Sequence, residues 1–212
     1  MKRHELHLIT TGKQELHEVK AIAVQCSTQH IDALHLREKQ RGAGELTAWY
    51  AELHTLLPGT AIYINDRLDA ALAVQAPGVQ LGFRSLSVPQ ARRILAPSQR
   101  IGCSVHSEDE AVAAAQAGAD FVMFGHIFAT ASKPGTPPRG IAALAEVVQA
   151  CPVPVIAIGG IEPHNVDTVL STGCSGVAVL SAILLHPDPA SQLARFHEAL
   201  ERTQHSPRRG YQ

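Results

Sequence analysis

Eight short β-branched segments alternate with longer Ala- and Leu-rich segments along the whole chain, and this repeat limits the possible folds more than any other feature. The ends of the first and last segments, residues 10 and 179, are separated by seven intervals of about 24 residues, the length of one strand and helix unit. The predicted strands are 6–10, 33–37, 61–65, 78–81, 100–104, 121–124, 155–158 and 176–179.

The segments between them have the composition of helices, and several begin with Ser or Pro and end near Gly. The clearest cover 44–57, 67–75, 87–95, 107–119 and 163–173. Near-continuous apolar strands separated by helices indicate a parallel sheet covered on both faces. An open doubly wound sheet is the main alternative. The number and even spacing of the strands favour an α/β protein with a single (β/α)8 TIM barrel.

The length of 212 residues, 45% of them hydrophobic, suits one sizeable core better than two. We therefore expect residues 1–202 to form one TIM barrel domain. Residues 203–212 are expected to form a polar C-terminal tail, frayed from the barrel.

Charge and composition exclude several kinds of partner. Lys and Arg total 18 against 19 Asp and Glu, and aromatic residues make up only 4%, so neither a nucleic-acid surface nor an anionic-membrane surface is indicated. No apolar stretch approaches the length of a membrane span or a signal peptide core. The four cysteines are far apart, which favours a reduced, cytoplasmic protein.

Active sites of (β/α)8 barrels are built from the loops that follow the strands, so these loops contain the candidate functional residues. Two glycines follow the seventh strand, and a short helix is expected to start after the eighth. Exposed backbone amides and the positive end of a helix suit a phosphate group. The predicted phosphate-binding residues are Gly159, Gly160, Leu180 and Ser181, although the glycines could simply turn the chain.

The second strand ends in "HLREK", where alternation would place His35, Arg37 and Lys39 on one side and Glu38 on the other. These three donors would bind an anion. A charged strand end paired with neighbouring carboxylates is the alternative. After the third strand, Asn65 and the following Asp66 offer oxygen ligands for Mg²⁺, but Asp66 could equally cap the next helix.

The stretch "FGHIFATASKPG" follows the sixth strand. A glycine lets the chain turn tightly there, so that His126 would project at the barrel mouth and could move a proton near neutral pH. Beyond it, Thr130, Ser132 and Lys133 offer hydroxyls and an ammonium group to an anionic substrate.

Other histidines are less informative. His106 lies near Cys103, but no second ligand pair accompanies them, so we expect structural roles. His4 and His7 also lack evident partners, although His7, on the first strand, could face the barrel interior.

Taken in order, "HLREK", "INDR", "VQLG", "GADFVMFGHIFAT", "PVPVIAIGGI" and "SGVAVLSAI" resemble the thiamin phosphate synthase superfamily of TIM barrels over most of the chain. The synthase joins a pyrimidine diphosphate to a thiazole phosphate with Mg²⁺, and its pattern is like QLREK, IND, HLGQxD and GPIFPTxTK. Here His35 stands in place of the first glutamine, Ser85 in place of a metal-binding aspartate, and His126 in place of the proline of GPIF.

These departures resemble the thiazole tautomerase (TenI-type) branch, whose pattern carries GH instead of GP. The resemblance implies an isomerase that aromatises a carboxythiazole phosphate without a cofactor or metal, with His126 as catalytic acid and base. It further implies a phosphate held by the glycine loops, a carboxylate near Thr130, Ser132 or Lys133, and a homodimer as a possible assembly.

Two alternatives remain at this level. Arg37, Lys39, Asn65 and Asp66 are retained from the synthase pattern, so Mg²⁺-dependent thiamin phosphate synthase is the first. A non-catalytic protein that binds thiazole phosphate for regulation is the second.

Overall fold

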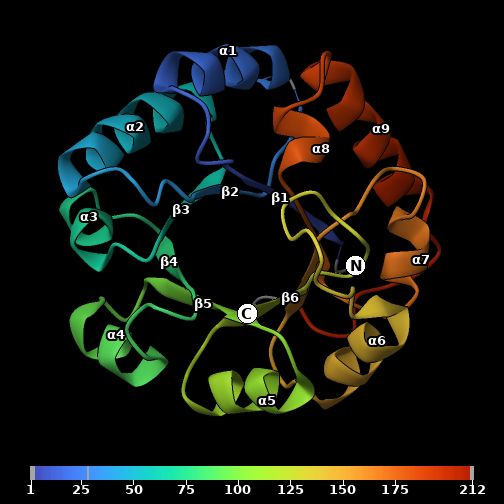
Figure 1. The fold of residues 1–212 in the computed structure, drawn as a ribbon. Coiled ribbons are helices and arrows are strands. Elements are labelled where there is room, and N and C mark those ends of the chain that lie inside the picture. Colours follow the sequence, from blue (N-terminus) through green and yellow to red (C-terminus); the bar gives the residue numbers. More distant parts are fainter. Residues whose placement is uncertain (1–2, 28, 211–212) are drawn as a thin grey trace.

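The computed structural model describes residues 3–27 and 29–210, and within them eight parallel strands close into a barrel with helices outside (Figure 1). The prediction of a TIM barrel is confirmed. The strands are β1 (Glu5–Ile9), β2 (Ala33–Leu36), β3 (Ala61–Asn65), β4 (Gly78–Leu81), β5 (Arg100–Val105), β6 (Phe121–Gly125), β7 (Val155–Ile158) and β8 (Gly176–Val179).

The helices form the outer layer around this ring (Figure 1). They are α1 (Leu16–Cys26), α2 (Ala43–Leu56), α3 (Leu68–Ala73), α4 (Val88–Ile94), α5 (Glu108–Gln116), α6 (Gly140–Ala150), α7 (Val166–Leu170), α8 (Ser181–Leu184) and α9 (Pro189–Arg202). None of these described helices has both the length and the apolar character needed to cross a membrane.

The sequence pattern placed the strands within about one residue of their observed ends. Local chemistry also explains why some helices begin where they do. The backbone amide of Ser87 donates to the side chain of Gln90 at 3.0 Å, and the hydroxyl of Ser107 accepts from the amide of Glu110 at 3.1 Å. Both contacts satisfy amides that a helix start leaves without partners.

The core has two parts. The larger lies between the strands and the helices, and it contains side chains that point outward from the strands. The smaller fills the barrel interior with Ile9, Ala33, Tyr63, Phe121, Met123, Ile156 and Ala178. Two histidines, His7 and His35, lie among these interior residues at 1% and 0% exposure.

Glycine makes room for the large interior side chains. A Cβ atom on Gly102 would lie 2.2 Å from Oε1 of Gln80 and 2.3 Å from Cζ of Phe121. No side chain larger than hydrogen fits there unless its neighbours move. Phe121 therefore reaches the barrel axis only because β5 carries glycine opposite it.

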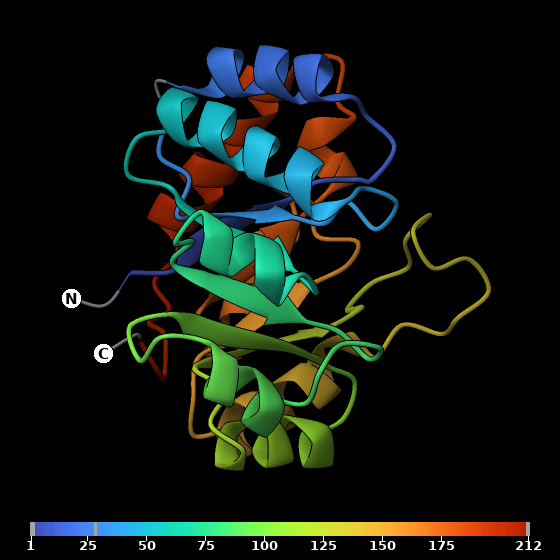
Figure 2. The ribbon, with the colours of Figure 1, turned by 90° about the vertical axis from the view of Figure 1, so that its left-hand side faces the viewer.

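The two ends of the barrel differ. In Figure 2 both chain ends lie on one side, and the loop after β6 extends from the other. Near the termini, a His4 ring nitrogen lies 3.1 Å from the carbonyl of His205, and the Ser175 hydroxyl donates to the carbonyl of Arg209 at 3.1 Å. The expectation of a frayed tail is wrong for the described residues 203–210, because backbone and side-chain hydrogen bonds hold them.

Burial, with the charge of His7 beside it, lowers the pKa of His35 well below its ordinary value. As the pH falls below about 6.5, the unfolded chain takes up a proton at this residue and the folded protein does not. We predict that unfolding free energy decreases over this range, with His35 contributing a slope of up to about 1.4 kcal/mol per pH unit.

Urea unfolding of the wild type and of His35→Gln between pH 5 and 8 measures this contribution. The variant should show the shallower pH dependence. Identical slopes for the two proteins would show that His35 is not held neutral by the fold.

Candidate active site

A hollow of about 370 Å³ opens where β2, β3 and β4 end, at the end of the barrel opposite the chain termini. The residues lining it come from the three loops that follow these strands: Glu38, Lys39, Arg41, Asn65, Asp66, Arg67, Gly82, Phe83 and Arg84. Two of the predicted substrate-binding residues, Lys39 and Asn65, are thus brought together.

Asp66 connects two of these loops. Its backbone has a φ of 64°, which Asp and Asn tolerate better than most residues. Its Oδ1 accepts a hydrogen bond from the Gly82 amide at 3.2 Å and another from the Ser85 hydroxyl. The alternative in which Asp66 caps the following helix is wrong, since α3 begins after Arg67 without a side-chain cap.

Two residues that line the hollow each have a buried oxygen without a hydrogen-bond partner within residues 3–27 and 29–210. These oxygens are Oε1 of Glu38 and Oδ1 of Asn65. Glu38 was expected to point away from the anion-binding side, and this is wrong: it is 6% exposed and lines the hollow. The alternation fails because β2 ends at Leu36, before the charged residues begin.

Positive charges crowd the same end of the barrel. The charge of Arg37 is the main cause of a lowered pKa at Lys39, with burial and Arg84 adding to it and Asp66 opposing it. The pKa of Lys133 is also lowered, first by burial and then by the charges of Arg139, Arg37 and Lys39. This end of the barrel, called the mouth below, therefore carries more positive than negative charge.

Lys133 belongs to the loop between β6 and α6. Its ammonium group donates to Nε2 of His106 at 3.3 Å, so the loop reaches back to the end of β5. Thr130 and Ser132 shape the loop instead: the Ser132 amide donates to the Thr130 hydroxyl at 3.3 Å, and the Lys133 amide donates to the Thr130 carbonyl at 3.1 Å.

His126 lies at the root of this loop and is 4% exposed. Its Nε2–H donates to the Thr136 carbonyl at 3.1 Å, and its own carbonyl accepts from the Arg139 amide at 2.9 Å. These contacts tie the outgoing and returning arms of the loop together. His126 is thus buried and hydrogen-bonded, and it does not project freely at the mouth.

The predicted phosphate-binding residues lie on neighbouring loops, because β7 and β8 pair side by side. Gly159 and Gly160 have φ values of 102° and 66°. A Cβ on Gly159 would lie 2.2 Å from Cβ of His126, so glycine is required there for the loops to pack. Leu180 precedes the short helix α8, which begins at Ser181.

His35 is not part of the mouth surface. It lies fully buried in the barrel, with Nε2 3.0 Å from Nδ1 of His7. The expectation that His7 lacks a partner is therefore wrong. Sequence reasoning missed Arg84 and Arg139, which carry no local motif. In the structure the charge of Arg84 lowers the pKa of Lys39, and that of Arg139 lowers the pKa of Lys133.

Comparison with known proteins places this geometry in a family. Residues 6–183 match the model of the thiamine monophosphate synthase family. The chain belongs to this family. Residues of the mouth therefore lie in a barrel shared with enzymes of thiamine biosynthesis.

Individual relatives agree. The chain is 45% identical over 162 residues to a thiamine-phosphate synthase of Chlorobium phaeovibrioides, covering 74% of this chain and 76% of the relative. It is 38% identical over 203 residues to that of Albidiferax ferrireducens, covering 92% and 91%. A solved thiamine phosphate pyrophosphorylase from Pyrococcus furiosus has a TM-score of 0.82 at 32% identity, covering 94% and 96%.

These relatives correct the functional prediction. The expectation of a thiazole tautomerase, an isomerase, is wrong, because the curated relatives are synthases, which are transferases. His126, Ser85 and His35 are three single-residue departures from a synthase pattern that the rest of the chain retains. The role of His126 as a tautomerase acid and base is withdrawn with that expectation.

The contacts of Asp66 give a test of how the mouth is held together. Asp66→Asn keeps the accepting oxygen and a residue type that tolerates positive φ, so the unfolding free energy should change by less than about 0.5 kcal/mol. Asp66→Ala loses two hydrogen bonds and strains the backbone, and should cost about 1–3 kcal/mol. Urea unfolding measures both. Equal costs would mean that Asp66 does not connect the loops.

Proposed function

We propose that this protein is a thiamine-phosphate synthase, which couples a pyrimidine diphosphate to a thiazole phosphate and releases diphosphate. One observation supports this most directly: Lys39, Lys133 and several arginines gather at one end of the barrel, where neighbouring cations and burial lower the pKa of both lysines. A polyanion between them would relieve the repulsion, and diphosphate has the charge to do so.

In this reaction a carbon–nitrogen bond forms to the thiazole and a carbon–oxygen bond to the diphosphate breaks. The electron pair of the broken bond leaves with diphosphate, so negative charge grows on the leaving group. Lys39, Lys133 and the arginines beside them would stabilise that charge as it develops. Groups fixed before the reaction do this at little reorganisation cost.

The residues present also fit a divalent cation. No group of three or more His, Cys, Asp or Glu side chains gathers as a metal site in the described ranges. Mg²⁺ nevertheless often uses only one or two carboxylates together with substrate phosphates. Asp66, with the unpartnered oxygens of Asn65 and Glu38 in the same hollow, would hold it. The bound ion would neutralise charge on the diphosphate.

The thiazole phosphate would bind at the loops after β7 and β8. Within the described residues, the backbone amides of Gly160 and Ser181 make no hydrogen bond to the protein. Phosphate oxygens accept from such amides readily, and barrels of this class often bind phosphate at the same two loops. Gly159 and Leu180 would shape this pocket around the phosphate.

In this proposal His126 has a different task from the one expected. Its bond to the Thr136 carbonyl holds the returning arm of the loop that carries Lys133. His126 would therefore act through the position of Lys133 rather than by moving a proton.

The test is a coupling assay with both substrates, with and without Mg²⁺. Purified protein should form thiamine phosphate only when Mg²⁺ is present. Lys133→Met should reduce kcat/KM by roughly 10- to 100-fold, since it removes a cation at the leaving group. Lys20→Met is the matched control, because Lys20 pairs with Glu52 on the outer helices.

Absence of coupling by the folded wild type with Mg²⁺ would overturn the proposal. Equal losses in the Lys133 and Lys20 variants would overturn the role of the mouth cations while leaving the activity in place.

A further inference from the structure

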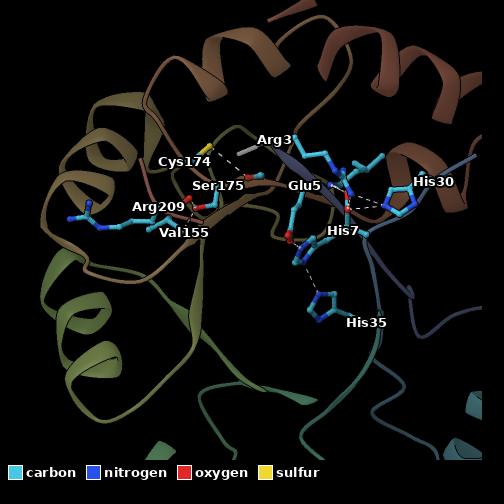
Figure 3. A network of polar contacts seen from close by, with 12 residues as sticks. Arg3, Glu5, His7, His30, His35, Val155, Cys174, Ser175 and Arg209 are labelled. Carbon is cyan, nitrogen blue, oxygen red and sulfur yellow. Dashed lines mark hydrogen bonds and ion pairs between the residues drawn. The ribbon is translucent and has the colours of Figure 1, made fainter. Parts of the chain in front are cut away.

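His106 differs from the histidines inside the barrel because it lies at the mouth. Figure 3 shows His7 between Glu5 and His35 in the barrel interior, where both rings are almost fully buried and neither lines the hollow. His106 follows β5 directly, is half-buried, and contacts Lys133 of the loop between β6 and α6. It therefore lies where it can act on a cation of the mouth.

The sequence after β5 builds the surroundings of His106. Ser107 is the N-cap of α5, and its hydroxyl accepts from the amide of Glu110 at 3.1 Å. Glu110 reaches back, and its Oε2 accepts from the amide of His106 at 2.7 Å. These hydrogen bonds across the first turn of the helix hold the carboxylate beside His106. The same Oε2 lies 3.5 Å from Nδ1 of the His106 ring.

Lys133 determines which ring nitrogen of His106 carries the hydrogen. An ammonium group can only donate, and Nζ of Lys133 lies 3.3 Å from Nε2 of His106. Nε2 must therefore offer a lone pair, so a neutral His106 carries its hydrogen on Nδ1. That N–H group faces the carboxylate of Glu110. Both ring nitrogens are thus matched to their neighbours.

Protonation of His106 would break this arrangement. An imidazolium carries a hydrogen on both nitrogens, so Nε2 would present a donor and a positive charge to the ammonium group of Lys133. The charged groups that act on His106 are Glu110 of α5, and Lys133 and Arg139 of the loop between β6 and α6. Burial and the two cations outweigh the carboxylate and lower the pKa of His106. The neutral form therefore prevails at neutral pH.

The contact with His106 holds the end of a long side chain. The amide of Lys133 donates to the Thr130 carbonyl at 3.1 Å, so the backbone of Lys133 is held as well. Its ammonium group has three hydrogens, and one of them is used by His106, which leaves two for an anion. Fixing a lysine before a ligand arrives reduces the conformational entropy that is lost on binding.

We propose that His106 and Glu110 are positioning residues, which hold the ammonium group of Lys133 at the mouth through a neutral His106 with its hydrogen on Nδ1. The use of that ammonium group for diphosphate rests on the proposed function. The contacts and the position of the hydrogen do not depend on it.

Nitrogen NMR of ¹⁵N-histidine-labelled protein tests the position of the hydrogen without any activity measurement. The signals of His106 are those that disappear in His106→Gln. In the wild type at about pH 8, Nδ1 of His106 should give the signal of a protonated nitrogen and Nε2 that of an unprotonated one. A hydrogen mainly on Nε2 would overturn the proposal.

Variants test the two contacts by opposite shifts. Lys133→Met removes a neighbouring cation, so the pKa of His106 should rise, and Glu110→Gln removes a neighbouring anion, so that pKa should fall. Glu110→Gln keeps an oxygen that can accept from the amide of His106. Lys20→Met is the control and should leave the pKa unchanged, because Lys20 pairs with Glu52. An unchanged pKa in Lys133→Met would show that the ammonium group is not held at His106.

The pH profile of the coupling reaction tests the effect on catalysis. His106→Gln keeps an acceptor for Lys133 but does not titrate, so at about pH 8 its kcat/KM should lie within about threefold of the wild-type value. Below about pH 6.5 the wild type should lose activity as His106 takes up a proton, and His106→Gln should lose less. Identical losses at acid pH in the two proteins would contradict the proposal.

A double-mutant cycle separates positioning from a general structural role. His106→Leu should lower kcat/KM roughly tenfold, because it removes the acceptor for Lys133. In the Lys133→Met background the same change should have little further effect. An equal loss in both backgrounds would show a structural role and overturn the proposal. Inactivity of the wild type would instead refute the proposed function and leave the NMR tests valid.

Discussion

Closure of the eight-stranded ring is the constraint on which the other features depend. Parallel strands in a closed barrel all end on the same rim, so loops far apart in the sequence become neighbours. Lys39 and Lys133 are separated by almost a hundred positions, yet the charge of Lys39 helps to lower the pKa of Lys133, and Arg37 lowers the pKa of both lysines. The ring thereby brings like charges together, and in the proposed function an anionic ligand would compensate them.

The same closure creates an interior that can hold polar groups. Gly102 leaves space for Phe121, and Phe121 contacts both interior histidines at its edge. His7 and His35 would be costly as unpaired polar groups in this setting. Their mutual hydrogen bond and the carboxylate of Glu5 reduce the cost.

Sequence reasoning predicted the barrel well because its signal is periodic. Apolar strand runs and the even spacing placed β3, β4, β7 and β8 at their observed bounds. The same reasoning failed where the direction of a side chain depends on the residue at which a strand ends. Alternation through "HLREK" assumed that β2 continues to Lys39, but the strand ends at Leu36 and Glu38 lines the hollow. Pairs such as Ser85 with Asp66, or His7 with His35, follow from three-dimensional contact and have no local sequence signal.

Single-residue departures proved a poor guide to activity. His126 suggested a proton shuttle, yet its hydrogen bond to Thr136 gives it a place in holding the loop. Ser85 replaces a carboxylate of the synthase pattern, yet its hydroxyl donates to Asp66, which lines the hollow. Similarity to synthases along most of the chain outweighs these positions.

The central claim is that the crowded cations of the mouth bind diphosphate. Calorimetric titration with inorganic pyrophosphate, in buffers of different ionisation enthalpy at mildly alkaline pH, tests it directly. Because the pKa values of Lys39 and Lys133 are lowered in the free protein, binding should raise them and take up protons. The variants Lys39→Arg and Lys133→Arg keep the charge but do not titrate, so they should bind with less proton uptake than the wild type. Absence of binding, or equal proton uptake in all three proteins, would contradict the account.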